Sequence, residues 1–316
     1  MKTLLITRPL PEPVVEAARA GYAVTLRDST LPLDPAELRA ALSGFDAVLP
    51  TLGDRFQADV FADVPQARAK ILANFGVGYN HIDVAAARAA GIKVTNTPGA
   101  VTDATADIAM LLMLATARRA GEGERVLRAG KWQGWHPTQF LGLHVSGKRL
   151  GIVGYGRIGQ AIARRAHFGF GMEVEFHNRS PVPDAGLPAL QVPFARAMAA
   201  DVVIVCVPGG PATRHLIGAE ALSHMAAHGI FVNISRGDVV DEAALIAALQ
   251  AGRIGGAGLD VYEHEPQGPA ALVAMQNVTL LPHLGTAALE VRLGMGMMAV
   301  ANLIAHAEGR PLPNPV

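Results

Sequence analysis

The stretch KRLGIVGYGRIGQAIARRA, residues 148–166, decides the fold of this chain. It begins with a β-branched strand pattern and continues into an alanine-rich helical pattern, with Gly154, Gly156 and Gly159 at the junction in G-x-G-x-x-G spacing. In such a turn the first glycine permits a tight bend, the second admits a pyrophosphate, and the third lets the helix approach the strand. The helix N-terminus then offers unpaired N–H groups to the phosphates. The stretch therefore predicts a dinucleotide site on an α/β sheet, against the alternative of a tight turn that binds nothing.

The tetrapeptide HNRS, residues 177–180, indicates which dinucleotide binds. NAD-selective sites place an Asp or Glu about 20 residues after the glycine turn, where it binds the ribose 2′-hydroxyl. This chain has Asn178 there, followed by Arg179 and Ser180, which can donate to a 2′-phosphate. A charge-assisted hydrogen bond contributes roughly 1.5 to 3 kcal/mol, a preference of about ten- to a hundredfold. We predict NADPH as the preferred cofactor and NADH as a possible one, unless Arg179 is only an exposed arginine in a polar turn.

Short β-branched runs alternate with alanine-rich stretches along the whole chain, a pattern typical of βαβ units and parallel sheets. A long helix is expected from Thr102 to about residue 120, ending at Gly121, and a closing helix over roughly 287–308. The two series of expected strands lie at 4–7, 23–26, 47–50, 70–75 and 92–96, and at 149–154, 174–177, 202–207, 230–235, 256–261 and 278–282. We therefore expect an α/β protein with two open parallel sheets, the second larger than the first.

Length and charge limit the classes of function. A chain of 316 residues suits two domains of about 150 residues each. Lysine plus arginine and aspartate plus glutamate number 27 each, so no charge excess favours nucleic acid or a membrane surface as partner. No apolar run suits a signal peptide or a membrane span, which favours a cytoplasmic location. The single cysteine, Cys206, cannot form an internal disulfide and is expected as a buried strand residue.

Three residues whose side chains can bind substrate or transfer a proton follow consecutive strands of the second series. Arg236 follows IFVNIS, Glu265 lies in GAGLDVYEHEP, and His283 follows VTLLP. Ligands of open α/β sheets bind at the carboxyl ends of the strands. There an arginine can bind a carboxylate, and a histidinium favoured by a glutamate can protonate a carbonyl oxygen that receives a hydride. Each residue could also be merely structural, but together they suit the reduction of a 2-oxo acid.

The motifs of other enzyme classes are missing. We find no G-x-S-x-G nucleophile elbow, no H-E-x-x-H and no Cys/His spacing for zinc, so hydrolase chemistry and a metal site have little support.

With these motifs the chain resembles the D-isomer-specific 2-hydroxyacid dehydrogenases, and within them the glyoxylate/hydroxypyruvate reductases. The resemblance spans nearly the whole chain. It rests on NFGVGYNHID (74–83), VTNTPGAVTDATADIA (94–109), GIVGYGRIGQAIA (151–163), NISRGDVVDEAAL (233–245), GAGLDVYEHEP (256–266) and LLPHLGTAA (280–288).

The resemblance implies a domain plan and a set of roles. A flavodoxin-like substrate-binding domain would combine residues 1–98 and 287–316, with a Rossmann cofactor domain, 99–286, inserted and catalysis in the cleft. By the same likeness Arg236 would bind substrate and His283 would act as acid and base with Glu265 as its partner. Backbone groups of Leu52, Gly76 and Val77 would hold the substrate carboxylate. The residues expected along the cofactor, besides the glycine turn and HNRS, are Thr105, Arg157, Ile158, Val207, Pro208, Thr213, Ile234 and Asp260.

The reductase branch implies further features. Its members are typically homodimers paired largely through the cofactor domain, and a tryptophan in the segment GKWQGWHP can reach the neighbouring subunit's active site, for which Trp135 is the candidate. Glu265 stands where formate dehydrogenases have a glutamine, which counts against formate as substrate. The chain ends at Val316, so no appended regulatory domain is expected.

The leading hypothesis is NADPH-preferring reduction of glyoxylate to glycolate and of hydroxypyruvate to D-glycerate. Two alternatives stay open. One is reduction of bulkier 2-oxo acids such as 2-ketogluconate or aryl-pyruvates, because pocket size cannot be seen in the sequence. The other is a non-catalytic NAD(P)-sensing binding protein, since some relatives of this fold act as co-repressors; the retained arginine, glutamate and histidine argue against it.

Overall fold

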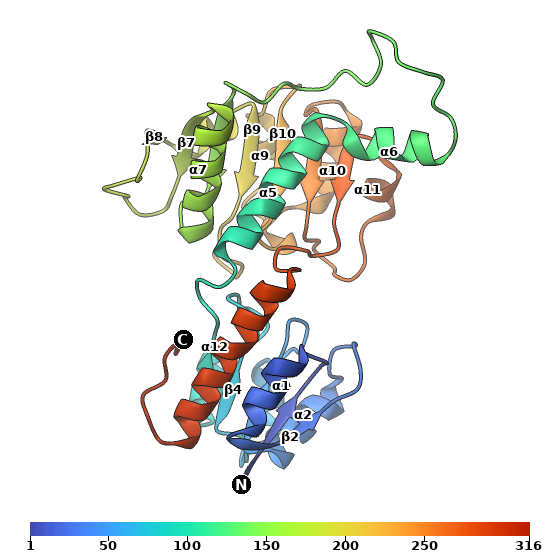
Figure 1. The fold of residues 1–316 in the computed structure, drawn as a ribbon. Coiled ribbons are helices and arrows are strands. Elements are labelled where there is room, and N and C mark those ends of the chain that lie inside the picture. Colours follow the sequence, from blue (N-terminus) through green and yellow to red (C-terminus); the bar gives the residue numbers. More distant parts are fainter. The chain divides into compact units, whose positions relative to one another are not determined.

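A computed structural model describes all residues, 1–316. The chain divides into two compact units, one made of residues 1–101 and 287–316 and the other of residues 102–286. Both units are α/β structures with open parallel sheets (Figure 1), so the predicted fold class is confirmed.

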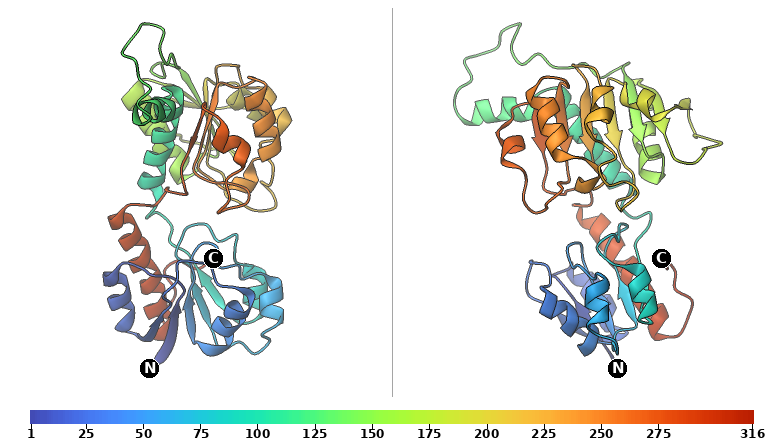
Figure 2. Two further views of the ribbon diagram at one scale, coloured as in Figure 1. Left: turned by 90° about the vertical axis from the view of Figure 1, so that its right-hand side faces the viewer. Right: turned by 180° about the vertical axis from the view of Figure 1, so that it is seen from behind.

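The first unit is a five-stranded parallel sheet in the order β2-β1-β3-β4-β5. Its strands are β1 (Lys2–Ile6), β2 (Tyr22–Leu26), β3 (Ala47–Leu49), β4 (Ile71–Ala73) and β5 (Lys93–Thr95). Its helices are α1 (Glu12–Arg19), α2 (Pro35–Gly44), α3 (Ala58–Ala62), α4 (Val84–Ala89) and α12 (Leu289–Ala307). Both chain termini belong to this unit, and α12 packs beside α1 and β4 (Figures 1 and 2).

The second unit is a seven-stranded parallel sheet in the order β12-β11-β10-β9-β6-β7-β8. Its strands are β6 (Arg149–Val153), β7 (Glu173–His177), β8 (Ala189–Gln191), β9 (Val202–Val205), β10 (Ile230–Asn233), β11 (Gly256–Leu259) and β12 (Val278–Leu280). Its helices are α5 (Thr102–Ala117), α6 (Ala120–Arg128), α7 (Arg157–Phe170), α8 (Phe194–Met198), α9 (Ala219–Ser223), α10 (Glu242–Gln250) and α11 (Ala270–Ala274), with a 3₁₀ turn at Gly237–Val239.

The sequence runs that predicted strands form the centre of this second sheet. Strand β9, VVIV, is buried along its whole length between β6 and β10. Side chains on its two faces enter two different apolar clusters, because successive residues of a strand point to opposite sides. The strand order reverses at β6, with β7 on one side and β9 on the other. Open sheets bind ligands at such a switch point, so the topology places the end of β6 where a dinucleotide is expected.

Two details differ from the sequence-based expectation. Helix α5 ends at Ala117, before Gly121, because Leu143 N–H donates to the Ala117 carbonyl (2.8 Å) and Arg119 adopts a left-handed φ of 52°. Gly121 therefore lies inside the next helix, α6, and does not end α5. Strand β8 was not predicted, since a three-residue edge strand carries no clear periodic signal.

Candidate active site

The glycine turn has the geometry that a bound dinucleotide requires. Gly154 directly follows β6 and has a φ of 97°, which favours glycine, and a Cβ there would lie 3.0 Å from the backbone of Cys206. A Cβ on Gly159 would lie 2.3 Å from the Gly154 carbonyl oxygen, so helix α7 can approach the strand only with glycine there. Gly156, in contrast, has no atom within 4 Å of its Cβ position. Gly154 and Gly159 therefore pack closely against protein atoms, whereas Gly156 leaves open space beside it. This arrangement fits a pyrophosphate at the start of α7.

The predicted 2′-phosphate residues lie directly beside this turn. Asn178 Oδ1 accepts a hydrogen bond from Tyr155 N–H (3.2 Å), and its Nδ2 donates to the Ser180 carbonyl (3.0 Å). The amide of Asn178 thus ties the end of β7 to the glycine turn. Arg179 is exposed and has no ion-pair partner in the structure, so its guanidinium is available to an anion. The Tyr155 ring stacks on Phe176 at 3.7 Å between centroids, which fixes the turn against the sheet.

Other residues expected along the cofactor surround the ends of β6, β9 and β10. Arg157 and Ile158 are the first residues of α7. Val207, Pro208 and Thr213 belong to the loop after β9, where Thr213 Oγ1 donates to the Pro208 carbonyl (2.7 Å). Ile234 follows β10 and is 6 % exposed. The structure describes these positions, and their contact with a cofactor stays a prediction.

Cys206 was expected as a buried residue of a strand over 202–207. It instead follows β9, which ends at Val205, and the residue is partly buried. Its thiol donates to the Gly154 carbonyl (2.9 Å), and burial raises its pKa to about 12. The group is therefore a packed, protonated thiol at the base of the glycine turn.

His283 and Glu265, predicted as acid/base and partner, are in contact. His283 Nδ1 lies 2.9 Å from Glu265 Oε2, and the side chains are 29 % and 31 % exposed. Burial raises the pKa of the Glu265 carboxyl, but the His283 hydrogen bond and the charges of His283 and Arg236 outweigh it, so the net shift is downward. A carboxylate that stays ionised favours the charged imidazole, and its contact with Nδ1 leaves Nε2 as the nitrogen that can give or take a proton.

The backbone around His283 is held in an uncommon conformation. His283 has a φ of 56°, in the left-handed region that a β-carbon disfavours. Asp260, 2 % exposed, fixes this turn: its carboxylate accepts from Leu284 N–H (2.6 Å) and Gly285 N–H (2.8 Å), and its carbonyl accepts from His283 N–H (3.0 Å). Thr105 Oγ1 donates to the Gly285 carbonyl (3.1 Å) from helix α5. Strain at a candidate site that several contacts enforce is a sign of preorganisation.

Arg236 follows β10, and Glu265 and His283 follow β11 and β12, the next two strands of the sheet. Asn233 Nδ2 donates to the Arg236 carbonyl (3.0 Å), and Arg236 Nη1 donates to the Ser235 carbonyl (2.6 Å). A Cβ on Gly209 would lie 2.6 Å from Arg236 Cγ, so the loop after β9 packs on the arginine stem. The structure therefore gathers the three candidate residues at the carboxyl ends of three adjacent strands. Burial lowers the pKa of this guanidinium.

The first unit carries the other residues expected to contact substrate. Leu52 follows β3, and Gly76 and Val77 follow β4. Asn74, fully buried, donates from Nδ2 to the carbonyls of Gly76 and Gly78, both at 3.0 Å, and Asn96 Nδ2 donates to the Val77 carbonyl (2.9 Å).

These bonds engage the three carbonyls of residues 76–78. Gly76 N–H donates to the Asn74 carbonyl (3.0 Å), whereas the N–H groups of Val77 and Gly78 have no acceptor within the protein. Successive free N–H groups form an anion-binding concavity, which suits a carboxylate. The sequence analysis missed the roles of Asn74 and Asn96, although an asparagine directly after each of two strand runs is the signal that could have identified them.

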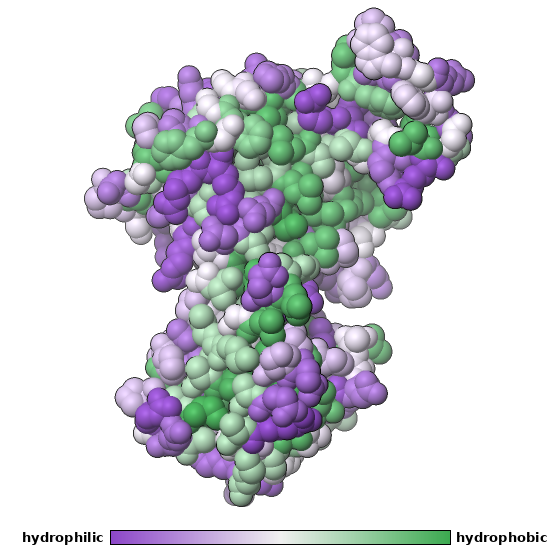
Figure 3. Space-filling view, in the orientation of Figure 1, coloured by the Kyte–Doolittle hydropathy of each residue, from purple (hydrophilic) through white to green (hydrophobic).

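Trp135 lies in the extended segment between α6 and β6 and is 80 % exposed. Helix α6 has no buried residue, and Leu127, Trp132 and Leu141 around it are also exposed. The segment projects from the second unit in Figure 1, and Figure 3 shows green, hydrophobic atoms on the surface around α5 and α6. This much exposed apolar area is typical of a surface that another protein covers.

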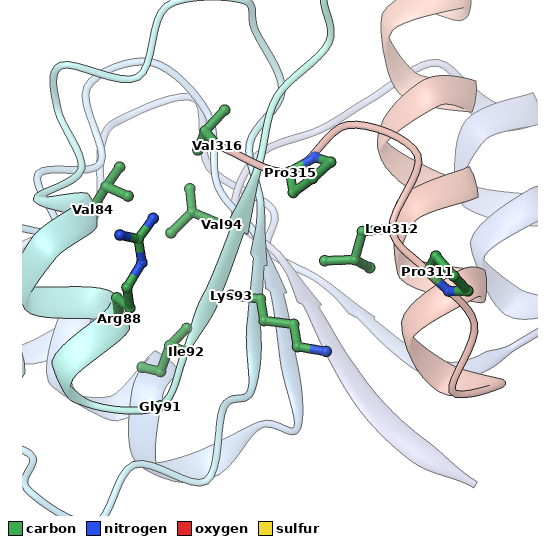
Figure 4. Close-up of a pocket in the computed structure, with 10 residues that line it drawn as sticks. All are labelled: Val84, Arg88, Gly91, Ile92, Lys93, Val94, Pro311, Leu312, Pro315 and Val316. Atoms are coloured by element: carbon green, nitrogen blue, oxygen red, sulfur yellow. The ribbon is translucent and has the colours of Figure 1, made fainter.

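A cavity of about 570 Å³ lies in the first unit, beside β5 (Figure 4). Apolar side chains of α4, β5 and the C-terminal segment line it together with Arg88 and Lys93. None of the candidate residues described above lines this cavity.

The structure contains no cluster of three or more His, Cys, Asp or Glu side chains suited to a metal ion. None of its helices is both long and apolar enough to cross a membrane.

Comparison with known proteins identifies the family of this chain. Residues 110–285 match the family model described as D-isomer specific 2-hydroxyacid dehydrogenase, NAD binding domain. A glyoxylate reductase of Thermococcus onnurineus is 42 % identical, over 98 % of this chain and 94 % of the relative. A crystal structure of a Thermus thermophilus protein superposes with a TM-score of 0.92 at 42 % identity, covering 99 % of both chains. The NADPH-dependent glyoxylate/hydroxypyruvate reductase of Sinorhizobium meliloti, solved with NADP and malonate, superposes with a TM-score of 0.88 at 36 % identity over 100 % of this chain and 96 % of that one.

The chain therefore belongs to the D-isomer specific 2-hydroxyacid dehydrogenase family. It is an NAD(P)-dependent oxidoreductase of that family, and the resemblance seen in the sequence is confirmed.

Proposed function

We propose that this protein reduces small 2-oxo acids, glyoxylate and hydroxypyruvate first, with NADPH as the preferred reductant. The observation that carries the proposal is the 2.9 Å contact between His283 Nδ1 and Glu265 Oε2, next in the sheet to Arg236 and in the same unit as the glycine turn. The names of the similar reductases from Thermococcus onnurineus and Sinorhizobium meliloti support the choice of substrates.

Each residue has one task in this proposal. Arg236 binds the substrate carboxylate, because a guanidinium can donate two parallel hydrogen bonds to it. His283, charged beside Glu265, donates the Nε2 proton to the C2 oxygen as that oxygen gains negative charge. The ionised Glu265 orients the imidazole through Nδ1 and stabilises its charged form. In the oxidation direction the same Nε2 accepts the hydroxyl proton.

When bound, the nicotinamide cofactor supplies the hydride that C2 receives. The second unit, with Gly154, Gly156 and Gly159 around the pyrophosphate, is proposed as the cofactor domain. Arg179 and Ser180 follow Asn178 at the end of β7 and would bind the 2′-phosphate. Because no carboxylate stands at residues 178–180, nothing there repels that phosphate.

The first unit is proposed as the substrate-binding domain. The N–H groups of Val77 and Gly78 are its candidates for a carboxylate, since they have no acceptor within the protein, whereas Gly76 N–H is engaged by Asn74. Leu52, half-buried after β3, would contribute a further backbone contact.

We also propose that the protein is a homodimer paired through α6 and the segment that carries Trp135. The exposed side chains of Leu127, Trp132, Trp135 and Leu141 support this, because a second copy would remove their apolar area from water. Trp135 would then contact the partner subunit.

Initial rates over a panel of 2-oxo acids, each with NADPH and NADH, test the proposal. We expect the highest kcat/KM for glyoxylate or hydroxypyruvate with NADPH, and at least about a 10²-fold lower kcat for His283→Ala with cofactor binding retained. Higher activity on 2-ketogluconate or aryl-pyruvates would favour the bulkier substrate class. Tight NADPH binding without turnover of any 2-oxo acid would instead indicate a sensing protein, and a near wild-type kcat for His283→Ala would disprove the assignment of the acid.

A further inference from the structure

A second glutamate, Glu263, lies two residues before Glu265 and has no task in the proposed reaction. The side chain of Glu263 is 12 % exposed, and its Oε1 contacts two side chains of the loop after β9. Arg214 Nη2 lies 3.1 Å from Oε1, and His215 Nε2 lies 2.7 Å from it. A nearly buried carboxylate oxygen shared by an arginine and a histidine ties two loops together.

We propose that Glu263 is a positioning residue, which couples the loop after β9 to the Glu265–His283 pair. The inference rests on the proposed function, because the proposed function assigns a cofactor contact to the loop after β9 and a proton transfer to the Glu265–His283 pair.

The backbone at Tyr262 and Glu263 makes further contacts besides those of the Glu263 side chain. Glu263 N–H donates to Oε1 of Glu242 (2.8 Å), a carboxylate on α10 that is 8 % exposed. A Cβ on Gly237 would lie 1.8 Å from the carbonyl carbon of Tyr262, so the 3₁₀ turn packs directly on this peptide. The segment is therefore clamped between α10, the 3₁₀ turn and the loop after β9, and cannot shift without breaking one of these contacts.

Short connections lead from this clamp to His283. Tyr262 N–H donates to Glu265 Oε1 (3.1 Å), while the other oxygen of that carboxylate contacts His283. The Tyr262 hydroxyl donates to the Leu281 carbonyl (2.9 Å), two residues before His283. Burial raises the pKa of this hydroxyl to about 12, so it remains a donor at neutral pH. A displacement of Glu263 is thus transmitted to both partners of the acid/base pair.

The loop after β9, which contacts Glu263 through Arg214 and His215, is also proposed to touch the cofactor. Val207, Pro208 and Thr213 lie in it, and Thr213 directly precedes Arg214 and His215. His215 has a left-handed φ of 50°, and its N–H donates to the Asp238 carbonyl (2.8 Å). Contacts of this loop with the cofactor would hold Arg214 and His215 on Glu263, where they already lie at 3.1 and 2.7 Å, and would so hold Glu265 against His283. The pair is then best aligned when cofactor is present.

The variants Glu263→Gln and Glu263→Ala distinguish the contacts of residue 263 with Arg214 and His215 from the negative charge of its carboxylate. The glutamine keeps an oxygen for both partners, whereas alanine removes it. Glu220→Ala, at an exposed position on α9 of the same unit, is the matched control. Three quantities are measured on the full chain: kcat and KM for glyoxylate, the melting temperature, and the NADPH Kd with and without oxamate, a non-reducible analogue of a 2-oxo acid.

For Glu263→Ala we expect a kcat at least about tenfold lower and a loss of at least half of the factor by which oxamate tightens NADPH binding, because that factor measures the coupling. Glu263→Gln should recover most of both values, and Glu220→Ala should equal wild type. A Glu263→Ala enzyme with wild-type kcat and coupling would overturn the inference. The inference would also be overturned if Glu263→Ala lowered the melting temperature while oxamate still tightened NADPH binding by the wild-type factor, and if Glu263→Gln did not restore kcat. Failure of the proposed function is a separate result, because in that case His283→Ala would keep its turnover.

Discussion

Gly237 gives the sharpest test of how tightly the loop that carries Glu265 is held. In Gly237→Ala, the new Cβ would lie 1.8 Å from the Tyr262 carbonyl carbon, 1.9 Å from its oxygen and 2.3 Å from Glu263 N, where ordinary contact begins at 3.4 Å. All three atoms are backbone, so no side chain can rotate away. The 262–265 segment must therefore move by roughly 1.5 Å relative to the 3₁₀ turn, a distance set by the overlap.

Such a shift should affect rate more than stability. Misplacing a reacting group by about 1 Å can cost about 10²-fold in rate, whereas overpacking typically costs about 1–3 kcal/mol of unfolding free energy. We expect Gly237→Ala to lower kcat/KM for glyoxylate about 100-fold and the melting temperature by roughly 2–12 °C, while the NADPH Kd stays close to wild type.

The control for this experiment is Gly169→Ala on α7. No atom lies within 4 Å of its Cβ position, so this variant should keep full activity and gain about 0.5–1 kcal/mol from better helix propensity. Steady-state kinetics and thermal melts of the two variants are compared. Full activity of Gly237→Ala at an unchanged melting temperature would show that the segment yields freely, and the reasoning would be refuted.

Three further predictions follow from single contacts. Arg179→Ala should raise the KM for NADPH about tenfold or more and leave that for NADH unchanged in steady-state kinetics; an equal loss with both cofactors would contradict it. The Cys206 thiol, with its pKa raised to about 12 by burial, should react with a disulfide reagent at pH 8 far more slowly in the native enzyme than in urea, and rapid native labelling would show that it is accessible. The hydrogen bonds from Arg68 and then Thr3 hold the pKa of Asp46 below its ordinary value, so its stabilisation is present above about pH 4 and is lost as the pH falls. The excess unfolding free energy of wild type over Asp46→Asn should therefore shrink between pH 7 and pH 3 in urea titrations, and a constant difference would rule this out.

The sequence allowed the fold class to be predicted because both signals that define it are local. The run VVIVCV and the glycines at 154, 156 and 159 reveal a buried parallel strand and a strand-to-helix turn without knowledge of the rest of the chain. The break between α5 and α6 could not be predicted in the same way. It depends on Leu143 N–H reaching the Ala117 carbonyl, a contact made across the whole α6 segment.

In the candidate site, too, features that depend on local sequence could be predicted and long-range contacts could not. Arg236, Glu265 and His283 could be placed together in advance, because each follows a strand and the carboxyl ends of neighbouring parallel strands meet at one edge of a sheet. Sequence order alone does not give the contacts that orient them. The contact of Asp260 with the cofactor stays a prediction. Its carboxylate also accepts hydrogen bonds from residues 24 and 25 positions away and so holds His283 in its left-handed conformation, which the sequence did not indicate.

This difference has a physical reason. A strand fixes where its last residue lies, but the direction of the following side chain depends on loops that make few regular hydrogen bonds of their own. In the second unit those loops are ordered by buried carboxylates: Asp260 holds the turn at His283, and Glu242 and Glu263 hold the segment that carries Glu265. Each of them accepts at least one hydrogen bond from a protein group, so it can influence the rate without touching substrate. Substitution of these acids should consequently alter the alignment of Glu265 with His283 before it alters the stability of the sheet below them.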